Sequence, residues 1–288
     1  MITVILNGFR RQEFLERQIE NVQSQTIAAE KVLIWNNGPT VSRSQISHRV
    51  SIANSSQNFG VWSRFAYALN AETEYICVLD DDTFPGLRFF EHCLRHMEAR
   101  PALYGARGLR FHSPNRYHPY EAFGWDGPNE SAQVVDIIGH AWFFKREWLA
   151  YFWRELPKKG SSRLVGEDMH LSHMLQKYGN IKSIVPPHPA EDLSVWGSDP
   201  VIAAELGIHE AAISGQPGAF EKFDAALRQN TKNGFKLCNE LGLASTSVVI
   251  GPAISRWAWL RRILARNKRL ERYARRAKKT LERLGVHI

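Results

Sequence analysis

Three consecutive carboxylates, Asp80-Asp81-Asp82, directly follow the apolar segment Tyr75–Leu79. The segment predicts a buried strand, and side chains alternate along a strand, so Asp80 and Asp82 can point to the same side. Their oxygens are hard ligands that suit Mg²⁺ or Mn²⁺, and such a cation can neutralise a diphosphate and help it to depart. A solvated acidic turn is the alternative, because Thr83–Gly86 favours a turn. We favour a cation because three neighbouring carboxylates would otherwise repel each other.

A second acidic pair, Glu167-Asp168, follows Gly166 at the start of a predicted helix. Carboxylates there interact favourably with the helix dipole, so simple capping is one interpretation. The catalytic interpretation is that Asp168 accepts a proton from an acceptor hydroxyl or stabilises positive charge on a sugar, and that Glu167 shares either role. The apolar strand Val134–Ile138 and the aromatic segment Trp142–Phe144 supply a predicted wall for the acceptor.

Both acidic segments need a scaffold that brings the ends of strands together. Short apolar segments alternate with amphipathic helical patterns over the first hundred residues, which is typical of βαβ units and a mostly parallel sheet. Ligands bind such a sheet at the carboxyl ends of its strands, which is where Asp80 stands. The predicted strands are 2–6, 31–36, 49–53 and 75–79, and the predicted helices are 11–24, 59–70 and 86–99.

The pattern changes beyond residue 100. Residues 110–133 are rich in Pro, Gly, Asn, His and aromatics, which predicts a long loop, and residues 186–218 predict a mobile loop or lid. Between and after these segments we expect regular elements again. They are a strand over Val134–Phe144, a helix near Arg146, a helix over Glu167–Tyr178 ended by Gly179, a strand over Ile181–Val185 and a helix over 219–230.

Four short motifs occur in a definite order along the chain. They are Val32-Leu33-Ile34-Trp35-Asn36-Asn37, Leu79-Asp80-Asp81-Asp82-Thr83, Ile138-Gly139-His140-Ala141-Trp142-Phe143-Phe144 and Gly166-Glu167-Asp168. In this order and spacing they resemble the exostosin-like family of GT-A glycosyltransferases, glycosyltransferase family 64, and more distantly glycosyltransferase family 2. The resemblance covers about residues 2–185, with vaguer similarity to residue 230.

The resemblance implies a GT-A fold, in which a mostly parallel sheet flanked by helices binds a nucleotide, and UDP as the carrier of the sugar. It also implies a metal site of the DxD type, with Mn²⁺ or Mg²⁺ held by Asp80 and Asp82. Amide side chains would pair with uracil or ribose, and arginines would offset phosphate charge. The implied donor-binding residues are Asn7, Arg10, Asn36, Asn37, Asn58, Arg64, Asp80 and Asp81. Taken singly, each asparagine also suits a turn or cap, and Arg64 also suits a solvated helix face.

The chain departs from the exostosin-like pattern in two places. Glu167-Asp168 stands where those relatives carry two aspartates, and the segment 110–133 has no counterpart. Exostosin-like relatives retain the anomeric configuration of the sugar, whereas family 2 members invert it with an aspartate base at this kind of motif. The resemblance therefore implies retention, with inversion as the alternative.

Basic residues concentrate at the end of the chain. Residues from Arg256 onward hold 12 of the 37 Lys and Arg but two of the 29 acidic residues, so the remainder is close to neutral. From Trp257, apolar residues recur at intervals of three or four, which predicts an amphipathic basic helix. We expect a GT-A domain over 1–250 and this tail over 251–288. The tail is predicted to bind an anionic membrane surface; packing on the body or oligomerisation is the alternative, and nucleic-acid binding is not expected.

Other residue types suggest a location and further site residues. Three cysteines without a CxxC pair suit reduced thiols, and neither a signal-peptide pattern nor an apolar stretch of about 18 residues is found. We expect a cytoplasmic protein, peripheral on the inner face of the cell membrane. His188 or His209 could complete the metal site, although chance placement among 11 histidines competes with this interpretation. Trp196 could cover the sugar with its ring or pack the loop.

The sequence thus predicts a metal-dependent enzyme that moves a hexose or N-acetylhexosamine from a UDP-sugar to an oligosaccharide or lipid-linked glycan. Surface polysaccharide or glycolipid biosynthesis would suit it. Three alternatives stay open. One is an inverting family 2-like enzyme, and another is a nucleotidyltransferase, for which Asn7–Arg11 is a weak phosphate loop. The third is a noncatalytic carbohydrate- or membrane-binding scaffold that keeps the fold.

Overall fold

The computed structural model describes residues 1–9, 11–41, 49–125, 127–158, 161–202 and 212–243. All of them belong to one unit of the chain, Met1–Val248. Arg10, His209 and the predicted basic helix over 251–288 lie outside the described residues. Within the described residues, no helix has the length and apolar character needed to span a membrane.

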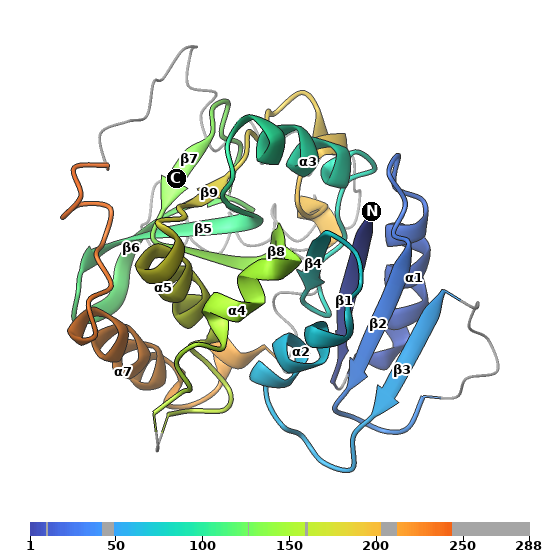
Figure 1. The fold of residues 1–288 in the computed structure, drawn as a ribbon, viewed down its shortest axis with the longest axis horizontal. Coiled ribbons are helices and arrows are strands. Elements are labelled where there is room, and N and C mark those ends of the chain that lie inside the picture. The colour runs from blue at the N-terminus through green and yellow to red at the C-terminus, as the bar shows by residue number, and fades with distance from the viewer. Residues whose placement is uncertain (10, 42–48, 126, 159–160, 203–211, 244–288) are drawn as a thin grey trace, which may run out of the picture. The chain divides into compact units, whose positions relative to one another are not determined.

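Four parallel strands form the N-terminal half of the sheet (Figure 1). They are β1 (Ile2–Gly8), β2 (Lys31–Asn36), β3 (Val50–Asn54) and β4 (Tyr75–Leu79). β1 lies between β2 and β4, and β3 is the edge strand beside β2. The central strands are apolar and buried almost without interruption, as expected of a parallel sheet covered on both faces. The four predicted strands are confirmed.

The second half of the sheet is mainly antiparallel. Its strands are β5 (Leu103–Ser113), β6 (Arg116–Gly124), β7 (Gln133–Val135), β8 (Ile137–Lys145) and β9 (Ser183–Val185). β8 pairs antiparallel with β4 and joins the two halves, β5 lies beside β8, and β6 forms a hairpin with β5. β9 runs parallel to β5, and β7 pairs antiparallel with β9. Together these strands make one mixed nine-stranded sheet within the described residues, which agrees with the predicted α/β class.

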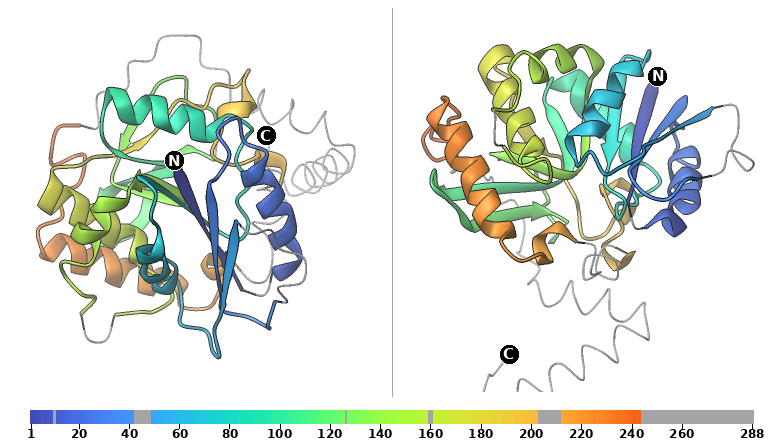
Figure 2. Two further views of the ribbon diagram at one scale, coloured as in Figure 1. Left: turned by 45° about the vertical axis from the view of Figure 1, so that its right-hand side comes forward. Right: turned by 90° about the horizontal axis from the view of Figure 1, so that it is seen from below.

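Helices cover both faces of this sheet. They are α1 (Leu15–Gln23), α2 (Trp62–Tyr67), α3 (Phe89–Ala99), α4 (Leu149–Phe152), α5 (Glu167–Gly179) and α7 (Ala219–Lys232). α1 lies on one face, and α2, α4 and α5 lie on the other (Figure 2). The predicted helical regions are confirmed. The first two are shorter than expected, because 3-10 turns at Gln12–Phe14 and Ala68–Asn70 occupy one end of each.

The alternation of side chains along β8 explains how the helices attach. Phe143 packs against Phe90 of α3 at 6.5 Å between ring centroids. Its neighbour Trp142 points to the opposite face and meets Phe65 of α2 at 5.8 Å, and Phe65 also stacks on Phe152 of α4 at 4.9 Å. All these rings are almost fully buried. The aromatic segment in β8 is therefore core on both faces of the sheet.

The predicted loop over 110–133 is wrong, because much of it is the β5–β6 hairpin. β6 is an edge strand with many exposed polar side chains and a proline at position 119, so its composition resembles that of a loop. The single strand predicted over 134–144 is in fact β7 and β8, separated at Asp136. The Asp136 carboxylate accepts hydrogen bonds from the backbone N–H groups of Phe111, at 2.7 Å, and Cys238, at 2.6 Å. Asp136, at the break between the two strands, therefore connects segments that are distant in the sequence.

The predicted lid over 186–218 is also wrong in its first part. His188 and Trp196 are fully buried, and the hydroxyl of Ser198 accepts a hydrogen bond from the backbone of Phe84 at 3.1 Å. Backbone bonds from Gly86 and Arg88 to Trp196 and Ser194 hold the same segment beside the start of α3. Residues 186–198 are therefore a packed connection, not a lid. Residues 203–211 lie outside the described residues.

Candidate active site

The two acidic segments found in the sequence line the same cavity. This cavity has a volume of about 650 Å³, a size suited to a small organic ligand, and Asp80, Asp82, Glu167 and Asp168 are among its lining residues. Asp80–Asp82 follow the carboxyl end of β4, and Glu167-Asp168 begin α5. The fold thus brings together carboxylates that are more than eighty residues apart.

Arg64 connects the two acidic segments. It lies on α2 and is buried, and its guanidinium forms one ion pair with Asp80 and another with Glu167, the second with 2.7 Å between Nη2 and Oε1. The guanidinium also lies over the ring of Trp142, 4.5 Å from the centroid. Burial opposes the charge on Arg64, but the two carboxylates outweigh it and raise its pKa further. The alternative of a solvated Arg64 is therefore excluded.

Arg11 performs a similar role for the other two aspartates. Its Nη1 lies 3.0 Å from Asp81 Oδ1 and 3.0 Å from Asp82 Oδ2. Burial would raise the pKa of Asp82, but His140 and Arg11 lower it to about 2. Burial and the adjacent Asp82 raise the pKa of Asp81 to about 7, against the opposing effect of Arg11. Asp82 is therefore ionised at neutral pH, whereas Asp81 is partly protonated.

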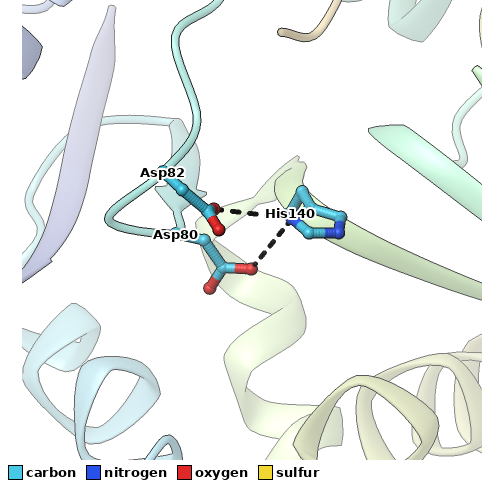
Figure 3. Close-up of side chains that lie close together, drawn as sticks. All are labelled: Asp80, Asp82 and His140. Atoms are coloured by element: carbon cyan, nitrogen blue, oxygen red, sulfur yellow. Dashed lines mark ion pairs between the residues drawn. The ribbon is translucent and has the colours of Figure 1, made fainter. Parts of the chain in front are cut away.

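Asp80, Asp82 and His140 form a group that suits a divalent cation. Their donor atoms all lie within 4.8 Å of one another. His140 Nδ1 is 3.5 Å from Asp80 Oδ2 and 3.6 Å from Asp82 Oδ1, and Figure 3 shows the three side chains facing one another. These are the two carboxylate oxygens that the arginines do not pair with. Within the described residues, the buried Nδ1 atom has no hydrogen-bond partner. Two carboxylates and one imidazole are a fitting donor set for Mn²⁺.

The backbone and a neighbouring ring hold His140 in this position. Its φ of +67° is in the left-handed region, which non-glycine residues rarely adopt, and such conformations concentrate at functional sites. Its carbonyl oxygen accepts a hydrogen bond from the backbone N–H of Asp80 at 2.9 Å, which fixes the end of β4 beside β8. The ring of Trp125 lies against the imidazole, with 3.7 Å between centroids.

Glu167 and Asp168 differ in their surroundings. Gly166 precedes them with a φ of +94°, which a glycine adopts without strain. Glu167 is buried and paired with Arg64, and burial raises its pKa to about 8 although Arg64 opposes this. Asp168 is less buried, and its Oδ1 accepts a hydrogen bond from Met169 N at 2.7 Å. Burial raises its pKa to about 6, against the effect of that hydrogen bond. Asp168 therefore suits a proton acceptor near neutral pH better than Glu167.

The predicted donor-binding asparagines have different surroundings. Asn7, Asn37 and Asn58 line the cavity, whereas Asn36 does not. The buried Oδ1 of Asn7 has no hydrogen-bond partner within the described residues, so it is available to a ligand. Asn37 is already engaged, because its Oδ1 accepts from Trp35 Nε1 at 2.8 Å.

Asn36 and Asn58 both stabilise turns. Asn36 Nδ2 donates to the carbonyl of Pro39 at 2.7 Å and to Asn54 Oδ1 at 2.8 Å. Asn58 is exposed, and its Oδ1 accepts from Gly60 N at 2.7 Å. Their predicted nucleotide contacts stay predictions. A nucleotide contact by Asn36 would require its side chain to break the hydrogen bonds that hold the turn.

Two predictions about the segment after β9 are settled by its packing. His188 Nδ1 lies 2.9 Å from the carbonyl of Pro186, and its Nε2 accepts from Gly197 N at 2.9 Å. Burial lowers its pKa to about 3, so the ring is neutral and both nitrogens are occupied. His188 as a metal ligand is therefore wrong. Trp196 is fully buried and donates to the carbonyl of Pro189 at 2.8 Å, so it packs the loop and does not cover a sugar.

The match to a protein-family model agrees with the geometry of the site. The model described as Glycosyl transferase family 2 matches residues 3–153, more than half of the chain. The matched region contains the acidic run, both site arginines and His140, whereas Glu167 and Asp168 lie beyond it. A search of curated proteins found no match. This match supports the more distant of the two resemblances seen in the sequence and gives no support to the exostosin-like one. The chain belongs to glycosyltransferase family 2, a family of enzymes that use nucleotide-sugar donors.

Proposed function

We propose that the protein transfers a hexose or N-acetylhexosamine from a UDP-sugar to a glycan acceptor with inversion of the anomeric configuration. The observation that carries this proposal is one cavity lined by both the cation-binding group and Asp168. The group of Asp80, Asp82 and His140 suits a cation that binds a diphosphate, and Asp168 suits an acceptor hydroxyl. A noncatalytic scaffold would not need to keep both.

The donor would bind with its diphosphate toward Asp80, Asp82 and His140. A cation bound by these residues would neutralise part of the diphosphate charge. Among the described residues the Oδ1 of Asn7 has no hydrogen-bond partner, so it can accept from an N–H or O–H group of a base or ribose. Arg64 and Arg11 hold one oxygen of Asp80 and one of Asp82, which leaves the other oxygens directed toward His140. The two arginines are therefore positioning residues in this proposal.

Asp168 would act as the general base. As the acceptor hydroxyl oxygen bonds to the anomeric carbon, Asp168 takes the hydroxyl proton. The bond between that carbon and the phosphate oxygen breaks at the same time, and UDP leaves with the electron pair. Attack from the side opposite to UDP inverts the configuration. Glu167, held by Arg64, would keep the start of α5 in place for this step.

Several finer parts of the proposal rest on the sequence. They are UDP as the carrier, an oligosaccharide or lipid-linked acceptor, a role in surface polysaccharide or glycolipid biosynthesis, and a cytoplasmic location at the inner membrane face. Retention was implied by the exostosin-like resemblance, whereas family 2 activity is typically inverting. We therefore propose inversion, and the anomeric configuration of the product decides between them.

The test is a UDP-release assay with UDP-glucose, UDP-galactose and UDP-N-acetylglucosamine in Mn²⁺, with the product examined by proton NMR. We expect release with at least one donor, a product of inverted configuration, and at least about a hundredfold loss in Asp82→Ala and Asp168→Asn. The control is Glu98→Gln, an exposed change on α3 away from the cavity. No Mn²⁺-dependent UDP binding by the unaltered protein, or full activity of Asp82→Ala, would contradict the proposal.

A further inference from the structure

Five aromatic rings gather on one wall of the active-site cavity. Tyr117, His118 and Tyr120 come from β6, and Phe220 and Phe223 come from α7. Tyr117 stacks on Phe223 with 4.8 Å between centroids, His118 stacks on Tyr120 at 4.4 Å, and His118 meets Phe220 at 4.9 Å. We name these five residues the ring wall. None of them is used by the chemistry described above.

The ring wall is supported from beneath by its own buried cluster. Leu109, Phe111, Met169 and Leu227 belong to this cluster, which is separate from the main core, and Tyr117, Tyr120 and Phe223 pack against it. These three rings are therefore held in place before any ligand arrives, which reduces the entropy lost on binding. Met169 follows Asp168 directly, and its backbone N–H binds the Asp168 carboxylate. The ring wall and the proposed base thus share one support.

Phe220 is an open member of the wall, with 46% of its surface exposed. A single exposed phenylalanine needs no explanation. Here, however, the ring faces a cavity that also contains the proposed base, and it lies beside other rings with polar groups among them. Arg107 Nη2 donates to the Tyr120 hydroxyl at 3.4 Å, so charge and hydroxyl groups border the apolar faces.

This mixture of surfaces suits a pyranose ring. A sugar has an apolar face of C–H groups, which stacks on an aromatic ring, and a rim of hydroxyls, which needs polar partners. An acyl chain would cover the charged group of Arg107 with hydrocarbon, which offers it no hydrogen-bond acceptor, and this is unfavourable. The wall therefore favours a carbohydrate over the lipid part of a glycolipid.

We propose that the ring wall binds the sugar residue of the acceptor, with the pyranose stacked on Phe220 and its attacking hydroxyl directed toward Asp168. The orientation of the hydroxyl toward Asp168 rests on the proposed function. Binding of a carbohydrate to the ring wall rests on the rings and polar groups alone. The acceptor class is then a hexopyranoside, whatever is attached to it.

The experiment measures carbohydrate binding separately from catalysis. Saturation-transfer NMR titrations use the full-length protein with the methyl glycosides of glucose, galactose and N-acetylglucosamine. We expect at least one glycoside to bind through its ring protons, and Phe220→Ala to raise its Kd about tenfold, equivalent to ~1.4 kcal/mol. Phe220→Tyr, which keeps the ring, should bind within about twofold of the unaltered protein. Leu87→Ala, an exposed apolar change outside the cavity, should leave the Kd unchanged.

Two results overturn the inference: no glycoside binds the unaltered protein, or Phe220→Ala binds as tightly as the unaltered protein. A calorimetric titration with UDP and Mn²⁺ on the same samples separates this inference from the proposed function. UDP binding without glycoside binding refutes the ring wall alone. Glycoside binding that requires Phe220, without UDP binding, refutes the proposed transfer and supports a carbohydrate site at the ring wall.

Discussion

The acid side of the pH profile should report the ionisation of Asp168. With a pKa of about 6, the ionised fraction of this carboxyl falls from about 0.9 at pH 7 to about 0.1 at pH 5. A general base must be unprotonated, so kcat/KM should fall about tenfold over this range as the pH is lowered. Arg64 is among the groups that lower the Asp168 pKa. Arg64→Met should therefore move the acid limb upward by about one pH unit, a typical effect of one nearby charge.

The assay is kcat/KM for sugar transfer between pH 4.5 and 9 with excess Mn²⁺. Cation ligands also release protons on binding, so the profile should be repeated at a tenfold higher Mn²⁺ concentration. Once Mn²⁺ saturates the site, a limb caused by Asp168 stays in place when more Mn²⁺ is added, whereas a limb caused by protons competing with Mn²⁺ for its ligands moves. Arg95→Met, which removes an exposed arginine on α3, is the matched control and should leave the limb unchanged. An acid limb that Arg64→Met does not move would refute the assignment of Asp168 as the base.

Three further predictions test the cation group, the core and the turn before α5. His140→Ala should weaken Mn²⁺ binding at least about tenfold in calorimetry, because one of three donor atoms is lost; unchanged affinity would exclude His140 from the site. Phe65→Ala should lower the unfolding free energy by about 3–5 kcal/mol in urea, whereas Leu69→Ala, at a residue that is 59% exposed, should change it little. Gly166→Ala should destabilise by at least about 1 kcal/mol, because φ is +94° and its Cβ would lie 3.0 Å from Ala226; equal stability would show that the turn relaxes.

The strands, and the position of Asp80–Asp82 at the end of one of them, were predictable because the signals are local. An apolar segment followed by Asp80-Asp81-Asp82 predicts the carboxyl end of a strand and favours a cation site there, without knowledge of any other segment. The β5–β6 hairpin was not predictable in the same way. Its edge strand is held by backbone pairing with β5, and its side chains are partly exposed, so composition alone resembles a loop.

The site residues that the sequence did not indicate are those that depend on distant pairing. His140 lies in an apolar strand, and it reaches Asp80 because β8 runs antiparallel to β4 with Ala141 opposite Leu79. A polar residue after Gly139 in an otherwise apolar strand was the available signal. Arg11 had a weaker signal, as one of two adjacent arginines after β1. Its contact with Asp81 and Asp82 follows from the pairing of β1 with β4.

The balance of charge in the cavity explains why the site should accept a cation. Five carboxyl groups line it, those of Asp80–Asp82, Glu167 and Asp168, and two buried arginines contact them. The pKa is raised for three of the five, at Asp81, Glu167 and Asp168. Those three hold protons more tightly than usual chiefly because they are buried, and the neighbouring carboxylates add to this effect. A bound cation would lower these pKa values, so cation binding and ionisation of Asp168 should assist each other: Mn²⁺ on the donor side would increase the fraction of ionised base on the acceptor side.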